Sequence, residues 1–208
     1  IIPALVGVDL ARRMPALQPY VFPSVCPVCG AALVPGGDEA ARCCPNDACP
    51  AQVRGRLEHF VSKSGVDIAG LSPALIAMLV EKGRLKTVAD LYRLHREDLV
   101  LPGREAGKST DRMLEAIAAS RRAELGRFIN GLGIPRVGEA AAKVLARRFG
   151  SLAALAAAQP GNLVAGRESV VPGLGAATAL SVRDYLAEPK NRALLGELQA
   201  AGVNPTEK

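Results

Sequence analysis

The sequence has no tryptophan, and its 208 residues include only three tyrosines, four phenylalanines and two histidines. β-Branched and aromatic runs are also scarce beyond about the first 25 residues. Alanine and leucine are abundant instead, which favours helices that pack through small side chains. Because His59 and His95 each stand alone within a helical pattern, we expect packing or surface roles for them. We find no catalytic constellation.

The sequence lacks a long hydrophobic run as well. No apolar stretch reaches the ~18 residues of a membrane span, and no charged-then-apolar leader is recognisable. We therefore expect no membrane partner and a cytoplasmic location. Residues 1–22 hold a short β-like run interrupted by Pro3 and then a proline-punctuated stretch. We interpret them as the tail of a preceding domain followed by a linker.

The net charge of +6 is unevenly distributed. Residues 1–53 carry a net charge of −1, residues 54–128 carry +4 and residues 129–208 carry +3. A phosphate-bearing partner would be attracted to the last two regions. A solvated, arginine-rich surface would have the same composition, so charge alone does not decide between these interpretations.

All five cysteines fall in residues 24–53. Cys26 and Cys29 form a CxxC pair followed by Gly30, and Cys44 and Cys49 form a CxxxxC pair. Two close pairs of thiolates suit one tetrahedral zinc ion. The turn sequence at 34–38 would fold the two halves together. We therefore predict a zinc finger over residues 23–54, with a closed site that stabilises the fold and does not catalyse.

Two other roles for the cysteines are less favoured. A pair of disulfides is a poor fit to a chain without an export signal, because the cytosol keeps thiols reduced. A redox CxxC would need a βαβ context that is missing here. Cys43 is expected to be a bystander, since Cys44 has a proline directly after it and the better spacing to Cys49.

From Ala51 the pattern becomes helical, with apolar residues at three- to four-residue spacing. These first apolar positions are Val53, Leu57, Phe60 and Val61. We expect helix breaks at Gly65, Gly83, Gly126, Gly150 and Pro160-Gly161. Ser151 should cap the helix that follows Gly150.

A short glycine-bearing turn that runs into a small-residue helix occurs four times. The clearest copies are 133–146, GIPRVGEAAAKVLA, and 171–179, VPGLGAATA. An upstream copy at 68–73 precedes an apolar helix, and a degraded copy at 101–109 runs into Met113. If the turns end at Ser72, Ala106, Gly138 and Gly175, the intervals are 34, 32 and 37 residues. An insertion at 166–170 would explain the longer last interval.

A repeat of this length indicates stacked supersecondary units. The pattern is that of the helix-hairpin-helix motif, whose turn grips a nucleic-acid phosphate through unpaired amides at a helix N-terminus. The alternative is purely structural, because glycine after a helix is often only a C-cap. The predicted fold class is mainly α, a small four-cysteine zinc finger followed by an all-helical domain of four such motifs over 55–205. The predicted DNA-binding residues are Gly70, Leu71, Gly107, Lys108, Ser109, Gly133, Arg136, Gly138, Lys143, Gly173, Gly175 and Ala176.

Two of the turns depart from the pattern. Ser72 and Ala106 stand where it favours glycine, so we expect these turns to form poorer amide cradles. Lys108 and Ser109 would compensate as direct phosphate ligands. Arg136 replaces the first glycine of the third turn and is expected to face a phosphate. For any single cation, a surface salt bridge is the competing interpretation.

The finger and the hairpins, in this order, resemble bacterial NAD-dependent DNA ligases over nearly the whole chain. In that family the end of an oligonucleotide-binding barrel precedes a four-cysteine finger and a domain of four helix-hairpin-helix motifs, and a BRCT domain usually follows. The stretches that carry the resemblance are 2–8, 26–30, 44–52, 67–71, 88–92, 131–139 and 191–204. The resemblance makes 1–22 the barrel tail and linker, and 206–208 a linker stub.

The resemblance implies a role in DNA replication and repair for the parent enzyme. That family uses NAD, with Mg2+, to adenylate a lysine in a KxDG motif and then seals a nick. None of the lysines here begins such a motif, so the segment is expected to be inactive alone. The implied role of this region is to hold nicked double-stranded DNA, independently of sequence, as a monomer associated with the nucleoid. Zn2+ would serve as a structural joint.

Two other classes of function fit part of the sequence. A stand-alone zinc and hairpin scaffold would bind branched or damaged DNA without any ligase partner. A base-excision glycosylase would need a lysine or aspartate beside one hairpin in a Gly/Pro-Asp motif, whereas the PGLG turn is followed by AATAL.

Overall fold

The computed structural model describes residues 6, 7, 9, 12, 17, 18, 20–36, 41–100 and 107–207. The chain divides into two compact units, Ile1–Pro45 and Asn46–Lys208. No helix within the described ranges is both long enough and apolar enough to cross a lipid bilayer. The β-like run expected near the N-terminus falls mostly on residues that lie outside these ranges, among them Ile2, Pro3 and Leu5.

The first unit contains a small antiparallel hairpin. Strand β1 (Val34–Pro35) pairs with β2 (Arg42–Cys43), with Val34 opposite Cys43. Upstream, an isolated bridge joins Val25 and Ala32 across the first cysteine pair. The predicted turn at 34–38 thus begins within β1, which pairs with β2 further along the chain. Residues 37–40 lie outside the described part.

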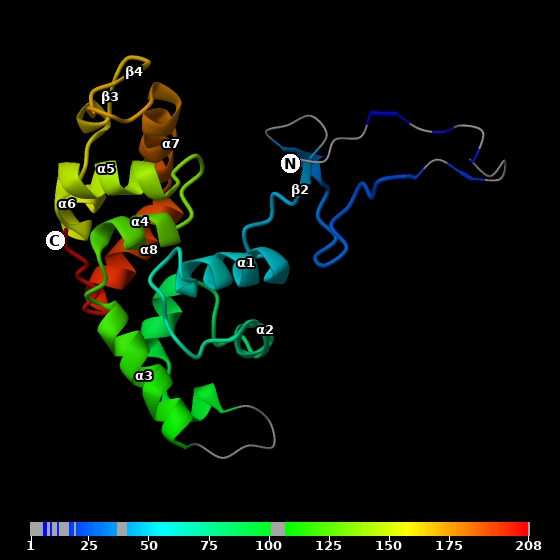
Figure 1. Ribbon diagram of the computed structural model, residues 1–208, viewed down its shortest axis with the longest axis horizontal. Helices are drawn as coiled ribbons and strands as arrows, with labels where there is room; N and C mark the ends of the chain where they lie inside the picture. Colours follow the sequence, from blue (N-terminus) through cyan, green and yellow to red (C-terminus); the bar gives the residue numbers. More distant parts are fainter. Residues whose placement is uncertain are drawn as a thin grey trace. The chain divides into compact units, whose positions relative to one another are not determined.

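The second unit is built from helices, as predicted (Figure 1). They are α1 (Pro50–Val61), α2 (Pro73–Glu81), η2 (Val88–Arg93), η3 (Arg96–Leu99), α3 (Lys108–Ser120), α4 (Leu125–Gly131), α5 (Glu139–Phe149), α6 (Leu152–Ala156), η4 (Pro160–Asn162), α7 (Ala176–Ala187) and α8 (Pro189–Ala200). Helix α1 packs on α2 and α4, and α4 lies beside α5. The mainly α fold class is therefore confirmed.

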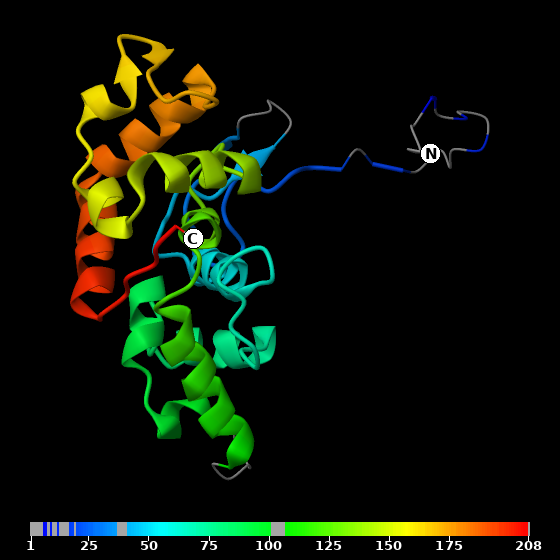
Figure 2. The ribbon, with the colours of Figure 1, turned by 60° about the vertical axis from the view of Figure 1, so that its left-hand side comes forward.

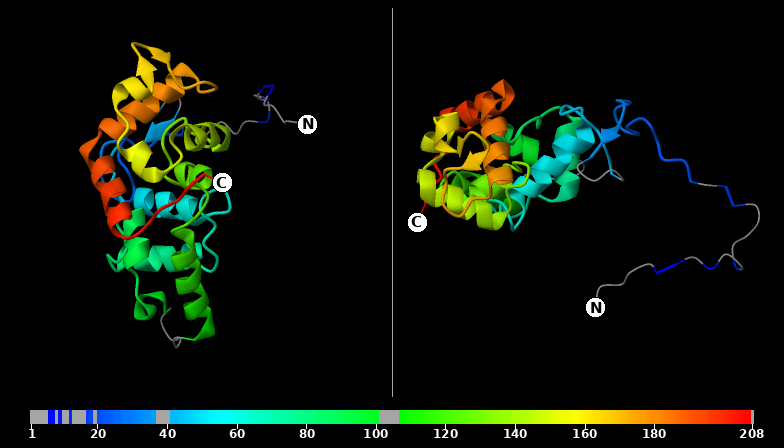
Figure 3. Two further views of the ribbon diagram at one scale, coloured as in Figure 1. Left: turned by 90° about the vertical axis from the view of Figure 1, so that its left-hand side faces the viewer. Right: turned by 90° about the horizontal axis from the view of Figure 1, so that it is seen from above.

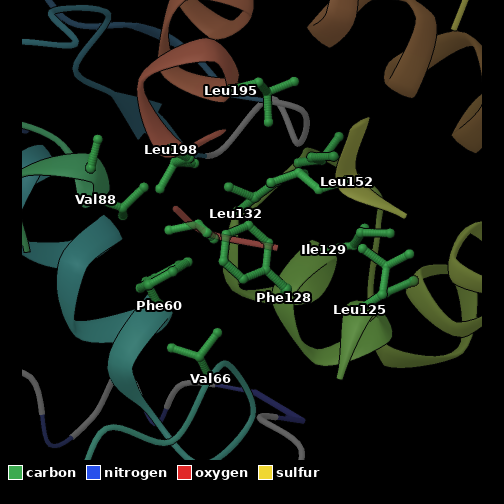
Figure 4. Packing of buried hydrophobic residues seen from close by; sticks show 14 of the residues in the cluster. Phe60, Val66, Val88, Leu125, Phe128, Ile129, Leu132, Leu152, Leu195 and Leu198 are labelled. Carbon is green, nitrogen blue, oxygen red and sulfur yellow. The ribbon is translucent and has the colours of Figure 1, made fainter. Parts of the chain in front are cut away.

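One apolar core joins these helices (Figure 4). The rings of Phe60 and Phe128 meet edge to face, 5.3 Å between centroids, and both side chains are fully buried. The helical pattern that starts at Ala51 supplies Val53, Leu57 and Val61 to the same core. Burial of one such large apolar side chain stabilises the fold by about 1.5–3 kcal/mol.

Two of the glycine signals lie directly after a helix, whereas Gly126 and Pro160-Gly161 lie within one, the latter pair in η4. Gly83 and Gly150 have left-handed φ values of +69° and +70° just after α2 and α5. Ser151 caps α6 as expected, since its hydroxyl accepts the Ala154 N–H at 3.2 Å. The break predicted at Gly126 is wrong, because this residue lies inside α4. An added Cβ there would sit 3.4 Å from the Lys143 side chain, an ordinary van der Waals contact, and α4 packs directly on α5.

The helical unit is not entirely helical. Strands β3 (Val164–Ala165) and β4 (Glu168–Ser169) form a two-stranded hairpin that packs beside α7 (Figure 3). Gly166, with φ +62°, lies in the two-residue turn between them. The hairpin accounts for the stretch at 166–170 that the repeat pattern marks as inserted.

The C-terminal end also differs from expectation. The resemblance makes residues 206–208 a linker stub, yet Thr206 pairs with both Glu124 and Ser151. The Leu125 N–H donates to the Thr206 carbonyl at 3.1 Å, and the Glu207 N–H donates to the Gly150 carbonyl at 3.3 Å. Figure 2 shows this segment, in red, running from the end of α8 towards α4. It completes the N-terminal end of α4.

Candidate metal centre and nucleic-acid interface

The structure brings together the four cysteines proposed as metal ligands. The sulfur atoms of Cys26, Cys29, Cys44 and Cys49 all lie within 4.8 Å of one another. The Cys29 and Cys44 sulfurs are 3.5 Å apart. A tetrahedral zinc site with Zn–S of about 2.3 Å has S···S edges of about 3.8 Å. The cluster therefore fits a four-thiolate zinc ion, whereas Cys43 is exposed and stands outside it.

Backbone hydrogen bonds shape both halves of this cluster. Gly30 takes a φ of +72° and donates its N–H to the Cys26 carbonyl at 2.9 Å, which folds the first knuckle. In the second knuckle, Asn46 accepts the Ala48 N–H through its side chain and the Cys49 N–H through its carbonyl, each at 3.0 Å. Cys49 is also the N-cap of α1.

Three of the four predicted turns share one backbone geometry. Gly70, Arg136 and Gly173 have φ values of +92°, +64° and +80°, and each stands two residues before the N-cap of the next helix. The residue between is a buried apolar one, Leu71, Val137 or Leu174. Arg136 thus occupies a glycine position, which costs of the order of 1–3 kcal/mol for a non-glycine residue.

The second turn has a different register from the predicted one. Helix α3 has Gly107 as its N-cap, so Gly107 and not Ala106 is equivalent to Ser72, Gly138 and Gly175. Residues 101–106, which include the remainder of this turn, lie outside the described ranges. With Gly107 as its end, the intervals between turns become 35, 31 and 37 residues.

The helix N-caps differ in how many backbone N–H groups they leave without an acceptor. Gly138 and Gly175 have no side chain that could cap α5 and α7. Within the described part of the chain, the N–H groups at 138–141 and 175–177 have no intramolecular acceptor. Two helix N-termini therefore present several unpaired amides, together with the positive end of a helix dipole.

The first turn leaves fewer amides open than the third and fourth turns do. The Ser72 hydroxyl accepts the Leu75 N–H at 3.2 Å, and Pro73, the first residue of α2, has no N–H to offer. The reason given for a poorer cradle, strain at a non-glycine residue, is wrong for this turn. Ser72 has φ −71°, an ordinary value, so the serine fits without strain and closes the turn by hydrogen bonding.

The predicted cationic contacts are of two kinds. Arg136 is exposed in the third turn and makes no ion pair with any described residue. Lys143 forms an ion pair with Glu139 one turn away on α5, at 2.9 Å. This contact raises the pKa of Lys143 and lowers the pKa of Glu139. Lys108 and Ser109 stand exposed in the first turn of α3.

Gly133 plays a different part from the other predicted glycines. It has a φ of +67° and ends α4, and a Cβ added there would lie 3.8 Å from the His59 ring. The His59 ring nitrogen is 2.9 Å from the Asn130 carbonyl. His59 is itself exposed, so this contact fits the packing or surface role expected for it.

The side chains that hydrogen-bond to the carbonyls of the turns were not identified from the sequence. Ser181 and Thr178 of α7 donate to the carbonyls of Pro135 and Arg136, at 2.6 Å and 3.5 Å. Arg127 of α4 donates to the Gly65 carbonyl at 3.0 Å. These contacts join positions far apart in the chain, and no local pattern marks them.

Known proteins match the chain in two ways. Residues 127–195, which span the third and fourth turns, match a family model described as helix-hairpin-helix motif. DNA ligase 1 of Opitutus terrae is 53% identical to this chain over 205 aligned residues. The alignment covers 99% of this chain and 30% of that protein. The chain is homologous to a segment of DNA ligases.

Other DNA ligases match with similar coverage. The DNA ligase of Symbiobacterium thermophilum is 45% identical over 206 residues, and DNA ligase 2 of Deinococcus deserti is 40% identical over 207 residues. These matches cover 98% and 100% of this chain. The chain spans about 30% of the length of the ligases it matches. The resemblance to DNA ligases seen in the finger and hairpin residues is confirmed.

Proposed function

We propose that this chain is the DNA-binding region of an NAD-dependent DNA ligase. In this proposal it grips nicked duplex DNA as a monomer, so that other domains can seal the nick during replication and repair. The matched helix-hairpin-helix model and the ligase relatives support DNA as the partner. Location at the nucleoid follows from the same proposal.

One observation carries the proposal. The third and fourth turns are built alike: the Val137 N–H bonds the Ile134 carbonyl at 3.0 Å, and the Leu174 N–H bonds the Val171 carbonyl at 3.1 Å. Each turn then ends in a glycine that leaves the next amides unpaired among the described residues. Such amides bind phosphate oxygens well.

Recognition of this kind carries no base information. Backbone amides and cations on phosphates position a protein on a duplex but do not read its sequence. Binding should therefore be insensitive to sequence and should weaken steeply as salt increases, because each neutralised phosphate releases counterions. The guanidinium of Arg136 would add to this electrostatic attraction.

The test is binding of the 208-residue chain to a nicked duplex, an intact duplex and a single strand, each across a salt series. Salt-sensitive binding to duplexes of unrelated sequence is the expected result. A tighter complex with the nicked duplex would assign nick preference to this region. Absence of duplex binding at low salt, by a folded chain with its metal bound, would overturn the proposal.

The four-cysteine cluster is proposed to hold Zn2+ in a structural role. With four thiolate ligands, the ion has no open coordination position for a substrate. We expect one zinc per chain by metal analysis, and chelation should unfold the knuckles, because zinc binding and folding are coupled in such modules. A chain that binds no zinc stoichiometrically would contradict this assignment.

Catalysis is assigned to parts of the parent enzyme outside this sequence. NAD and Mg2+ would be used there, and no KxDG lysine is present in this chain. We expect the chain alone to form no lysine–AMP adduct with NAD and to seal no nick. Transfer of AMP from radiolabelled NAD to this chain would refute that expectation.

A further inference from the structure

The third and fourth turns are tied to each other by reciprocal contacts. From α7, the Ser181 hydroxyl donates to the Pro135 carbonyl at 2.6 Å and the Thr178 hydroxyl approaches the Arg136 carbonyl at 3.5 Å. In return, Gly173 of the fourth turn lies against Val144 of α5, 3.7 Å from where its Cβ would be. Each hairpin therefore packs its helix on the turn of the other.

The contact from Ser181 falls on the peptide group that carries the Arg136 N–H. Peptide groups are planar and trans, so the C=O and N–H of one group point in opposite directions. Holding the Pro135 carbonyl against α7 therefore directs the Arg136 N–H away from α7. That N–H has no acceptor among the described residues.

Arg136 also needs support from its surroundings. Its φ of +64° is a left-handed conformation that arginine rarely adopts. A residue held in such a conformation persists where neighbouring contacts fix it. The Ser181 hydroxyl bond, at 2.6 Å, is the shorter of the two side-chain hydrogen bonds that this turn receives from α7.

We propose that Ser181, assisted by Thr178, is a positioning residue for DNA binding. It fixes the turn of the third hairpin from the helix of the fourth, so that the Arg136 amide and guanidinium and the α5 N-terminus are preorganised for phosphate. This inference rests on the proposed DNA binding. It adds that the two hairpins bind as one coupled unit and not as two independent sites.

A matched pair of substitutions tests the role of the hydroxyl. Ser181→Thr keeps a hydroxyl, whereas Ser181→Val has nearly the same shape as threonine without it. Ser151→Ala serves as a control, because it removes the hydroxyl that caps α6 and touches neither turn. Affinity for a nicked duplex, its salt dependence and thermal stability are measured for all three and for the unchanged chain.

We expect Ser181→Val to bind the duplex roughly three- to tenfold more weakly, the loss typical of one neutral hydrogen bond. The slope of affinity against salt should stay the same, since no charge is removed. Ser181→Thr should bind as the unchanged chain does. Ser151→Ala should lower the melting temperature and leave affinity unchanged.

Equal affinity of the Thr and Val variants, with duplex binding by the unchanged chain intact, would overturn the positioning role alone. A loss of affinity that simply follows melting temperature, shared by Ser151→Ala, would also overturn it. Absence of duplex binding by the unchanged chain would instead refute the proposed function. The three outcomes are therefore distinguishable.

Discussion

The first hairpin and the last two differ at the residue that begins the second helix. In the first, the Ser72 hydroxyl accepts the Leu75 N–H and Pro73 removes another donor. In the third and fourth, Gly138 and Gly175 have no side-chain cap, and the amides at 138–141 and 175–177 have no partner among the described residues, although the Thr178 N–H donates to the Gly175 carbonyl at 3.0 Å. The same turn can thus stabilise its own helix or remain open to a ligand.

This difference shows why a good helix cap and a good phosphate site compete. A side-chain cap satisfies the amides that an anion would otherwise bind. We expect the first hairpin to serve mainly as a packing element, in line with the contact from Arg127 of α4 to the carbonyl of Gly65. The four substitutions below test the comparison between the first hairpin and the last two.

The largest effect is expected for Gly138→Asp. Gly138 has φ −96° and open space around it, so an aspartate fits without strain. Its carboxylate would cap α5 and repel phosphate at the same site, a repulsion of up to about 4 kcal/mol at close range. We expect at least ~30-fold weaker duplex binding, with thermal stability unchanged or raised, and Gly161→Asp as the matched control for charge. Unchanged affinity would remove the third turn from the interface.

Gly138→Ser converts the third hairpin to the cap of the first. The serine hydroxyl should accept an amide of the first turn of α5, as Ser72 does in α2. We expect roughly three- to tenfold weaker binding, since one neutral donor is withdrawn, together with a slightly higher melting temperature. Titration with duplex DNA measures the affinity, and thermal unfolding measures the melting temperature. If the serine variant binds as tightly as the glycine form, cap identity does not control access to these amides.

Glu139→Gln should strengthen binding about two- to fivefold at low salt, because it removes a negative charge from the α5 N-terminus and releases Lys143 from its ion pair. The Lys143 ammonium lowers the pKa of Glu139. A lowered pKa keeps the carboxylate ionised at neutral pH, so the gain should be constant between about pH 6 and pH 9. Affinity titrations at several pH values check this. A gain that survives high salt would point to another cause.

The smallest effect on DNA is expected for Ser72→Ala. Loss of the cap should lower the free energy of unfolding by about 1 kcal/mol, measured by urea denaturation. Duplex affinity should not change, because Pro73 still lacks an N–H. A clear loss of affinity in a folded variant would mean that the first hairpin also binds DNA and that the comparison is mistaken.

Much of this organisation is readable from local sequence, and the exceptions have a common cause. The turns at 133–138 and 171–175, the Ser151 cap and the cysteine pairs are short-range patterns, and the structure reproduces them. Gly126 and the Ser181 hydroxyl depend on partners far along the chain, so local patterns give the wrong answer or none. The predicted register of the second turn is wrong because α3 has Gly107 as its N-cap, a position that glycine suits better than alanine.

The pairing of Thr206 with the start of α4 has a consequence for the order in which the chain folds. The first amide of α4, that of Leu125, finds its acceptor in Thr206, which lies far along the chain beyond α5, α6, α7 and α8. Individual helices form within microseconds, whereas a contact between such distant residues must first close a long loop. Completion of the third hairpin should therefore come late in folding. If these contacts are absent from the folding transition state, weakening them should speed unfolding more than it slows folding.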